Sequence, residues 1–288
     1  MTSVALIALA ATSCDDNKND WDKNTMNLQT ESPVIVIPVS SADEPYFVND
    51  YRIRFSQSLE DGKVSVRSMT PITLPDGSSF TFETPATNIT GNQLTNIINP
   101  VPYTDDSGRQ IRLSSRLTQQ YYAFNSSTGD VESIGQFPIS LTDVYVGSSI
   151  IIKTIQKESC FTGTTTTLIN GGSPYSNDGV SYLLTLDIAN RSATMTILNA
   201  KLAEQMPEIK IMRLRNLSLI PSKSSGYIVY GENIVPEVLE GTTWVPNNRF
   251  AFNNFSLQPT NDNLSMASIS YTVAGIYTGS CQGSYIVQ

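Results

Sequence analysis

The sequence contains no histidine, and its 18 lysines and arginines are outnumbered by 26 aspartates and glutamates. Histidine is the commonest general base, the usual partner of a serine or cysteine nucleophile, and a frequent metal ligand. Its absence excludes a histidine-dependent triad, a histidine-ligated haem and the usual zinc hydrolase site for this chain acting alone. The net charge of -8, without a dense Lys/Arg run, excludes nucleic acid as a partner.

Other chemical signatures are also missing. The sequence has no P-loop, no dinucleotide fingerprint and no Ser-x-x-Lys motif, so no cofactor is expected. Carboxylates are the only abundant acid-base groups, which leaves open a glycosidase that uses an Asp/Glu pair. Nothing singles out such a pair. Solvated strand faces are the commoner explanation for the carboxylates in or beside expected strands, which are Glu83, Asp143, Asp187 and Glu232. We expect neither catalytic nor metal-ligating residues.

The N-terminus holds the most specific motif. Residues 4 to 13 read VALIALAATS, an apolar run too short to span a bilayer, which takes about 20 residues, but typical of a signal peptide. The tetrad from Ala11 to Cys14 resembles a lipobox, in which small residues precede a cysteine that carries the lipid. The sequence therefore predicts a signal peptide over residues 1–13, lipidation of Cys14, and a membrane as partner through the lipid.

A polar stretch follows the cysteine and predicts a flexible acidic tether over residues 14–33. The acidic residues directly after Cys14 resemble the surface-export signal of lipoproteins from Bacteroides-type bacteria. The competing interpretation is that Asp15 resembles an inner-membrane retention signal of enterobacteria. We prefer an outer-membrane location facing the cell exterior, because the acidic residues are doubled and a long tether follows.

Strand patterns dominate from residue 34 onward. Over residues 51 to 67, apolar and polar residues alternate on either side of Asp61-Gly62, which predicts a β-hairpin. Residues 182 to 197 alternate in the same way around Asn190-Arg191. Evidence for helix is slight, and its best instance is NITGNQLTNIIN at residues 88 to 99.

The two hairpins look like copies, separated by about 130 residues. Further pairs agree: PDGSSFTFE at 75 to 83 resembles PSKSSGYIVYGE at 221 to 232, and FPISLTDVYVGS at 137 to 148 resembles MASISYTVAGIYTGS at 266 to 280. The alternative is chance similarity between short alternating strands. We predict an all-β fold of two tandem antiparallel sandwich or barrel-like domains, related by duplication, over residues 34–160 and 161–288.

Two cysteines and five aromatic residues are the remaining site candidates. Outside the cytoplasm Cys160 and Cys281 could form a disulfide, although two separately buried thiols are equally credible. Exposed Tyr and Trp rings stack on sugars and other flat apolar faces. The candidates for ligand contact are Tyr121, Tyr122, Tyr227, Tyr230 and Trp244, each of which could instead pack in a core.

Together, the lipobox-like ATSC, the following DDNKND and the Asn/Ser/Thr-rich body resemble uncharacterised surface lipoproteins of Bacteroides-type bacteria. This resemblance implies a duplicated calycin-like or sandwich module. The first functional hypothesis is a non-catalytic binding or accessory protein that captures an extracellular glycan, nutrient or partner protein. The second is a structural or adhesive fimbria-like subunit whose edge strand accepts a donated one. A carboxylate-dependent glycan hydrolase is the third.

Overall fold

The computed structural model describes residues 25–39, 42–58, 60–87, 90–92, 95–97, 102–117, 120–124, 131–136, 140–170, 172–260 and 266–285. Within these ranges strands predominate, and the only helical element is one 3-10 turn, η1 (Asn248–Phe250). The prediction of an all-β fold with very little helix is confirmed. No helix in the described ranges is long and apolar enough to cross a membrane.

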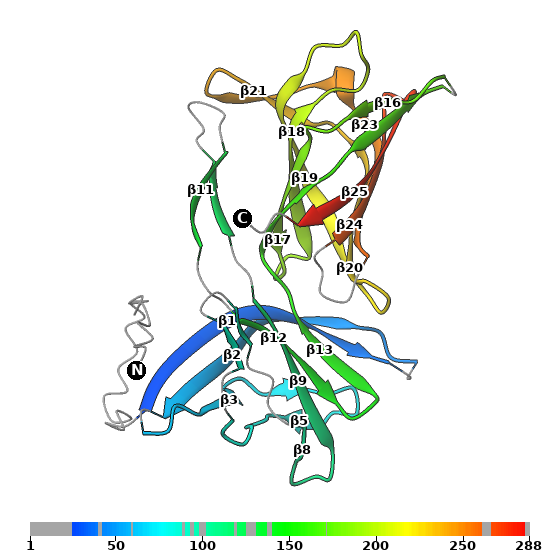
Figure 1. Ribbon diagram of the computed structural model, residues 1–288. Coiled ribbons are helices and arrows are strands. Elements are labelled where there is room, and N and C mark those ends of the chain that lie inside the picture. The colour runs from blue at the N-terminus through cyan, green and yellow to red at the C-terminus, as the bar shows by residue number, and fades with distance from the viewer. Residues whose placement is uncertain are drawn as a thin grey trace.

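The first sheet is open and uses the chain up to Thr154 (Figure 1). Its seven strands run in the order β3-β2-β1-β13-β12-β9-β8, with antiparallel neighbours. They are β1 (Thr25–Pro38), β2 (Tyr46–Ser58), β3 (Val64–Ser68), β8 (Tyr103–Thr104), β9 (Gln110–Leu117), β12 (Ser140–Val146) and β13 (Ile150–Thr154). The sheet curls like half a barrel, but the pairings described for these strands do not join β3 to β8.

Three short hairpins accompany this sheet. They are β4 (Ile72–Thr73) with β5 (Ser79–Phe80), β6 (Thr90–Asn92) with β7 (Thr95–Ile97), and β10 (Gln120–Phe124) with β11 (Val131–Gln136). The helical interpretation of residues 88 to 99 is wrong, because its described residues lie in β6 and β7. Its apolar spacing is too short a signal to separate one helical turn from a hairpin.

The second sheet closes into an eight-stranded antiparallel barrel. Its order is β14-β17-β18-β19-β20-β23-β24-β25, and β25 pairs back to β14 through Phe161↔Tyr285 and Thr162↔Ser284. The strands are β14 (Glu158–Thr162), β17 (Ser181–Asp187), β18 (Ser192–Ala200), β19 (Ile209–Ser222), β20 (Gly226–Ile234), β23 (Phe252–Pro259), β24 (Met266–Val273) and β25 (Tyr277–Tyr285). Two additions extend it: β15 (Thr165–Ile169) with β16 (Tyr175–Asn177) beside β25, and β21 (Glu237–Glu240) with β22 (Thr243–Pro246) beside β19.

Each sheet buries one face of its alternating strands. In β18 the residues at alternate positions from Ala193 to Ile197 are buried, and their neighbours are half-buried. The same rule builds the core of the first sheet, where Val64 and Val66 are buried and Arg67 is exposed. Both predicted hairpins, β2–β3 and β17–β18, are confirmed with their turns in the expected places.

The C-terminal part of β1 is buried on both faces, as its continuous apolar run VIVI at residues 34–37 indicates. Val34 and Val36 belong to the core of the first sheet. Ile35 and Ile37, which alternate with them, belong to the apolar cluster of the barrel. The barrel therefore stands on the outer face of the first sheet, and one strand contributes to both cores (Figure 1).

Two predicted boundaries need correction. Residues 25–33, assigned to the tether, lie in β1, because they pair with β2 along Thr25↔Ser58 to Ser32↔Tyr51. The division after residue 160 falls inside β14, whereas the change of sheet lies between Thr154 and Glu158. Both boundaries depend on which strands pair with each other, and the sequence pattern of a single segment does not show its pairing partner.

Candidate functional site

One end of the barrel brings together four connections from distant parts of the chain. In an up-and-down barrel, every second connection lies at the same end, so the β15–β16 hairpin, the 201–208 loop, the β21–β22–η1 segment and the 274–276 turn come together. Figure 1 shows this end pointing away from the first sheet. We call it the distal rim and define it by Tyr175, Lys201, Arg213, Val235, Trp244, Arg249, Phe250 and Ile276.

Three cation-ring contacts mark the distal rim. The Nζ of Lys201 lies 5.7 Å from the ring centre of Tyr175, and Cζ of Arg249 lies 5.8 Å from that of Phe250. The closest contact is between Arg213 and Trp244, at 4.0 Å. Among the described residues of the barrel, cation-ring contacts occur at this end alone. Such contacts contribute about 0.5–1 kcal/mol at exposed sites, and they hold rings and cations at the surface in fixed orientations.

The Arg213–Trp244 pair is positioned by strand register. Arg213 lies opposite Glu237 in the β19–β21 pairing, and Trp244 lies opposite Leu239 across the β21–β22 hairpin. The Nε and Nη2 atoms of Arg213 donate to one carboxylate oxygen of Glu237 at 2.8 and 2.5 Å. The guanidinium is thus held over the indole of Trp244, which is half-buried and keeps part of its surface open to solvent.

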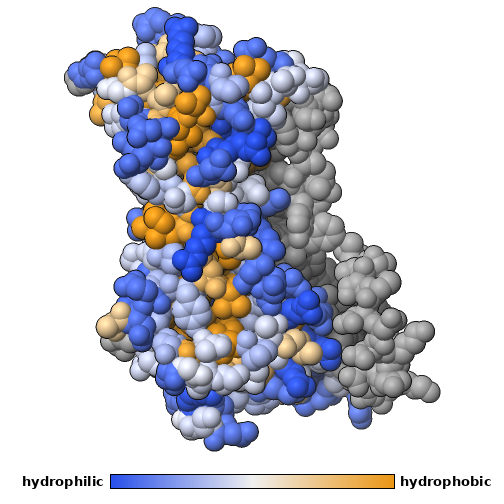
Figure 2. Space-filling view, turned by 180° about the vertical axis from the view of Figure 1, so that it is seen from behind, coloured by the Kyte–Doolittle hydropathy of each residue, from blue (hydrophilic) through white to orange (hydrophobic). Residues whose placement is uncertain are grey.

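Exposed apolar side chains add to the distal rim. Val235 is 41% exposed in the β20–β21 connection, and Ile276 is 38% exposed in the β24–β25 turn. On the face seen in Figure 2, apolar side chains otherwise form a narrow, interrupted band between hydrophilic regions. The rim therefore combines rings, arginines and apolar groups in one place, a composition typical of binding surfaces.

Of the ring candidates from the sequence, Trp244 lies in the distal rim and Tyr230 on the outer wall of the barrel. Tyr230 is half-buried and its hydroxyl donates to Glu232, which raises the pKa of Tyr230. Tyr227 is wrong as a ligand-contact prediction, because it is 2% exposed and packs in the barrel core. Three positions separate the two tyrosines on β20, so they point to opposite faces.

The remaining candidates from the sequence lie where the structure describes no side chains. Tyr121 and Tyr122 lie in β10, and their side chains are outside the described part of the structure. Cys14 also lies outside the described residues. Ligand contact by the two tyrosines and lipidation of the cysteine stay predictions.

Cys160 and Cys281 are both buried free thiols, so the possible disulfide is not formed. Cys281 belongs to the cluster inside the barrel. Phe161 belongs to the same cluster, and since adjacent strand residues point to opposite faces, Cys160 points outward. The wall of the barrel separates the two sulfurs. Burial raises the pKa of the Cys160 thiol to about 12 and also raises that of Cys281.

The carboxylates have structural partners. Asp187 accepts from the amide of Asn190 in the β17–β18 turn, Asp143 accepts from the backbone of Thr154, and Glu83 lies 3.8 Å from Arg67. Within the described ranges, every carboxyl whose pKa shift is resolved has a lowered pKa, whereas a general acid needs a raised one. The same ranges contain no group of three or more acidic or cysteine side chains that could hold a metal.

Sequence reasoning missed the partners of Trp244 and the other two ring pairs. Three connections between strands separate Arg213 from Trp244 along the chain, and the pairing of β21 with β19 brings them together. A weak signal was present in Arg213-Leu-Arg215, whose alternation indicates two arginines on one strand face.

No protein-family model matches the chain, and no curated protein matches it in sequence. Among solved structures, isotype 1 transferrin binding protein B from serogroup B Neisseria meningitidis is 6% identical with a TM-score of 0.28, covering 91% of this chain and 77% of that one. Intact Ap-TbpB, with N and C lobes, is 7% identical with a TM-score of 0.26, covering 91% and 78%. A TbpB double mutant from Haemophilus parasuis Hp5 is 6% identical with a TM-score of 0.25, covering 92% and 76%.

Proposed function

We propose that the protein is a lipid-anchored cell-surface binding protein that captures an extracellular ligand, a glycan or a partner protein, on its distal rim without catalysing a reaction. One observation carries this proposal: the rim with its three cation-ring pairs lies at the end of the molecule opposite the first sheet (Figure 1). The first sheet contains β1, the strand that follows the proposed anchor. Tethering there would hold the rim farthest from the membrane.

The proposed attachment to the membrane uses the N-terminal segment that precedes β1. Residues 1–13 form the signal peptide, Cys14 carries the lipid, and residues 14–24 are the tether that remains before β1. Two β-domains follow, meeting between Thr154 and Glu158. The acidic residues after Cys14 favour export to the outer surface of a Bacteroides-type outer membrane.

The rim suits ligand capture because Trp, Tyr and Arg dominate the binding energy of most interfaces. Arg213 and Trp244 are already fixed against each other by Glu237, so little side-chain freedom is lost on binding. The hydrolase hypothesis has no support from the described carboxylates, whose resolved pKa shifts are all downward. The fimbria-like alternative stays a prediction, which the oligomeric state of the purified protein tests.

The location is tested by labelling growing cells with a radioactive fatty acid and by treating intact cells with protease. We expect label on the wild-type protein and none on Cys14→Ala, and we expect protease to remove the barrel from intact cells. Unlabelled wild-type protein, or a barrel protected until the cells are broken, contradicts the proposed location.

Binding is tested with a glycan array and immobilised mucin as probes. We expect saturable binding that Trp244→Ala weakens at least about tenfold, the scale of an interface anchor residue. Arg191→Gln is the matched control, because Arg191 is exposed in the β17–β18 turn at the opposite end of the barrel. If the Trp244 variant binds as the wild type does, the rim is not the ligand site.

A further inference from the structure

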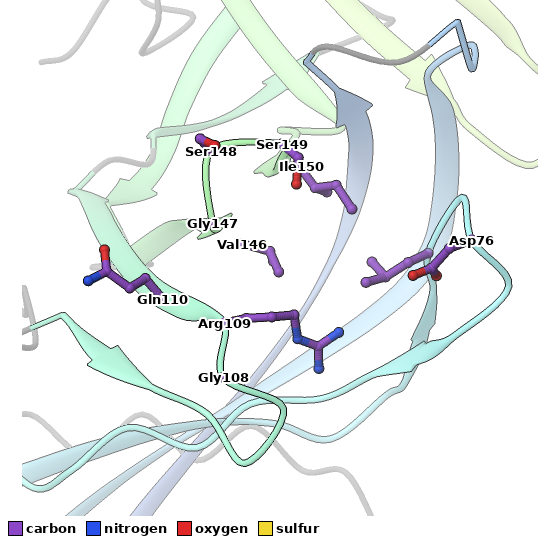
Figure 3. Close-up of a pocket in the computed structure, with 10 residues that line it drawn as sticks. Asp76, Gly108, Arg109, Gln110, Val146, Gly147, Ser148, Ser149 and Ile150 are labelled. Carbon is purple, nitrogen blue, oxygen red and sulfur yellow. The ribbon is translucent and has the colours of Figure 1, made fainter.

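A pocket lies in the first sheet, at the end where three turns meet (Figure 3). The pocket has a volume of about 500 Å³ and lies between the β4–β5, β8–β9 and β12–β13 turns. Its lining is Leu74, Asp76, Gly108, Arg109, Gln110, Val146, Gly147, Ser148, Ser149 and Ile150. This size is within the range of small-molecule sites.

Arg109 is the cation of the pocket and is held in place on two sides. Its Nε donates to Asp105 at 2.8 Å, and its guanidinium carbon lies 5.2 Å from the ring centre of Phe80. Asp105 is 13% exposed and also accepts from the backbone of Arg109 at 2.7 Å. Among the described residues no hydrogen bond uses the terminal Nη atoms of Arg109, so four N–H donors remain for a ligand.

Asp76 provides the opposite charge. Its Oδ1 accepts from the backbone and hydroxyl of Ser78 at 2.9 and 2.6 Å, and the described side chains leave Oδ2 without a hydrogen bond. The hydrogen bonds from Ser78, with a smaller contribution from Arg109, hold the pKa of Asp76 below its ordinary value. Figure 3 shows Arg109 extending across the pocket toward the side where Asp76 lies, yet the two do not form an ion pair.

The other side chains that line the pocket are apolar on its buried side and polar at its solvent-exposed edge. Leu74 and Val146 are core residues, 4% and 2% exposed, and Ile150 adds a half-buried side chain. Ser148 and Ser149 are exposed at the edge. The lining contains no aromatic ring on which a sugar could stack.

We propose that this pocket binds a small zwitterion, an α-amino acid with an apolar side chain, as a site separate from the distal rim. The ligand carboxylate meets the Nη donors of Arg109, and its ammonium meets Oδ2 of Asp76. Its side chain lies on Leu74, Val146 and Ile150. This arrangement places a negative group on the Nη donors of Arg109 and a positive group on Oδ2 of Asp76, whereas a neutral sugar offers neither charge.

The test is isothermal titration of the full-length protein in detergent with L-leucine as the probe. We expect saturable binding at millimolar concentration or tighter, with N-acetyl-L-leucine and L-leucinamide, which each lack one charge, at least about tenfold weaker. Absence of binding at about 10 mM L-leucine, or equal binding of the two blocked compounds, overturns the proposal. So does preferential binding of glucose.

Variants locate the site. Asp76→Asn keeps the turn, because an amide oxygen still accepts from Ser78, and should weaken L-leucine about tenfold while leaving N-acetyl-L-leucine unchanged. Arg112→Gln is the matched control: Arg112 lies on β9 close to Arg109 in sequence, but it is exposed over Tyr145 and is not part of the lining. A loss in Arg112→Gln equal to that in Asp76→Asn contradicts the site. Trp244→Ala should leave leucine binding intact, which separates this site from the proposed rim function.

Discussion

The strands of the open sheet and of the barrel pair in a similar order, but only the second sheet closes into a barrel. In the first sheet β1 pairs with both the next strand, β2, and the last, β13. In the barrel β14 likewise pairs with β17 and with the last strand, β25. The segments that resemble each other in sequence also correspond, since β12 and β24 are each the next-to-last strand of their sheet. The difference lies in the middle of each half.

The middle of the barrel contains long strands, whereas the middle of the first half contains very short ones. β19 and β20 have 14 and 9 residues, while β4 and β5 have 2 each. Pro71, Pro75 and Pro85 interrupt the first half there, and proline has no N–H to donate to a neighbouring strand. Among the described residues, the first sheet continues beyond β3 through two isolated bridges, Val64↔Thr87 and Arg67↔Glu83, and not through a named strand. We infer that a sheet of this order closes into a barrel only where the segments in its middle form strands long enough to hydrogen-bond to both neighbours.

The largest expected effect comes from core truncation in either half. Phe161→Ala in the barrel and Phe80→Ala in the open sheet each remove a side chain with 1% exposure or less and should cost about 3–5 kcal/mol of unfolding free energy. Because β1 contributes to both cores, we expect each variant to lower one shared transition in urea unfolding. Two separate transitions, with only one moved by each variant, would show that the halves are not coupled through β1.

A smaller effect is expected from Gly163→Ala at the seam of the barrel. An added Cβ at this position would lie 2.5 Å from the carbonyl oxygen of Gln282 and 3.1 Å from the sulfur of Cys281. Backbone cannot move aside as a flexible side chain can, so we expect a loss of about 1–3 kcal/mol in the same unfolding measurement. Ser280→Ala, on the exposed face of β25, is the control and should change stability by less than about 0.5 kcal/mol.

Amide hydrogen exchange should distinguish the closed barrel from the open edge of the first sheet. The amides of β25 are paired on both sides, with β24 and with β15, whereas β8 is a two-residue strand at the edge of its sheet. We expect amides of β8 to exchange at least about tenfold faster than those of β25, since edge positions open locally without global unfolding. Equal protection in the two strands would mean that the first sheet is closed in solution.

The smallest effect concerns the thiols. Burial raises the pKa of Cys160 to about 12 from an ordinary value near 9. The protonated thiol therefore favours the folded state fully below pH 9, and this contribution is lost as the pH rises toward 12. At pH 8 we expect both thiols to react with a maleimide only after unfolding, and a reducing agent to leave the melting temperature unchanged. Rapid labelling of the native protein would refute the burial of these thiols.

Local patterns were sufficient for individual hairpins. Asp61-Gly62 marks a turn in which Gly62 adopts a φ of 73°, and Asn190-Arg191 marks another in which Arg191 has a φ of 48°. Each turn lies between strands whose alternation already gives their inward and outward faces. The all-β class follows from the same local rules, so the sequence was enough to predict it.

Contacts between distant segments could not be predicted in the same way. Closure of the barrel requires Phe161 to pair with Tyr285, and no local pattern specifies that pairing. The spacing of Tyr227 and Tyr230 shows that they face opposite sides of β20, but not which side is the core. Arg109 and Asp76 lie on different turns of an otherwise ordinary sheet, so their approach across the pocket has no linear signal.

The two-faced strand β1 also affects the order of folding. If the chain is exported from its N-terminus, β1 emerges first, but its partner β13 follows about 120 residues later. Until then one edge of β1 and both apolar faces of its residues 34–37 lack their final neighbours, and pairing over such sequence separations makes folding slow. A holding chaperone on the far side of the membrane would protect this segment during its exposure to solvent.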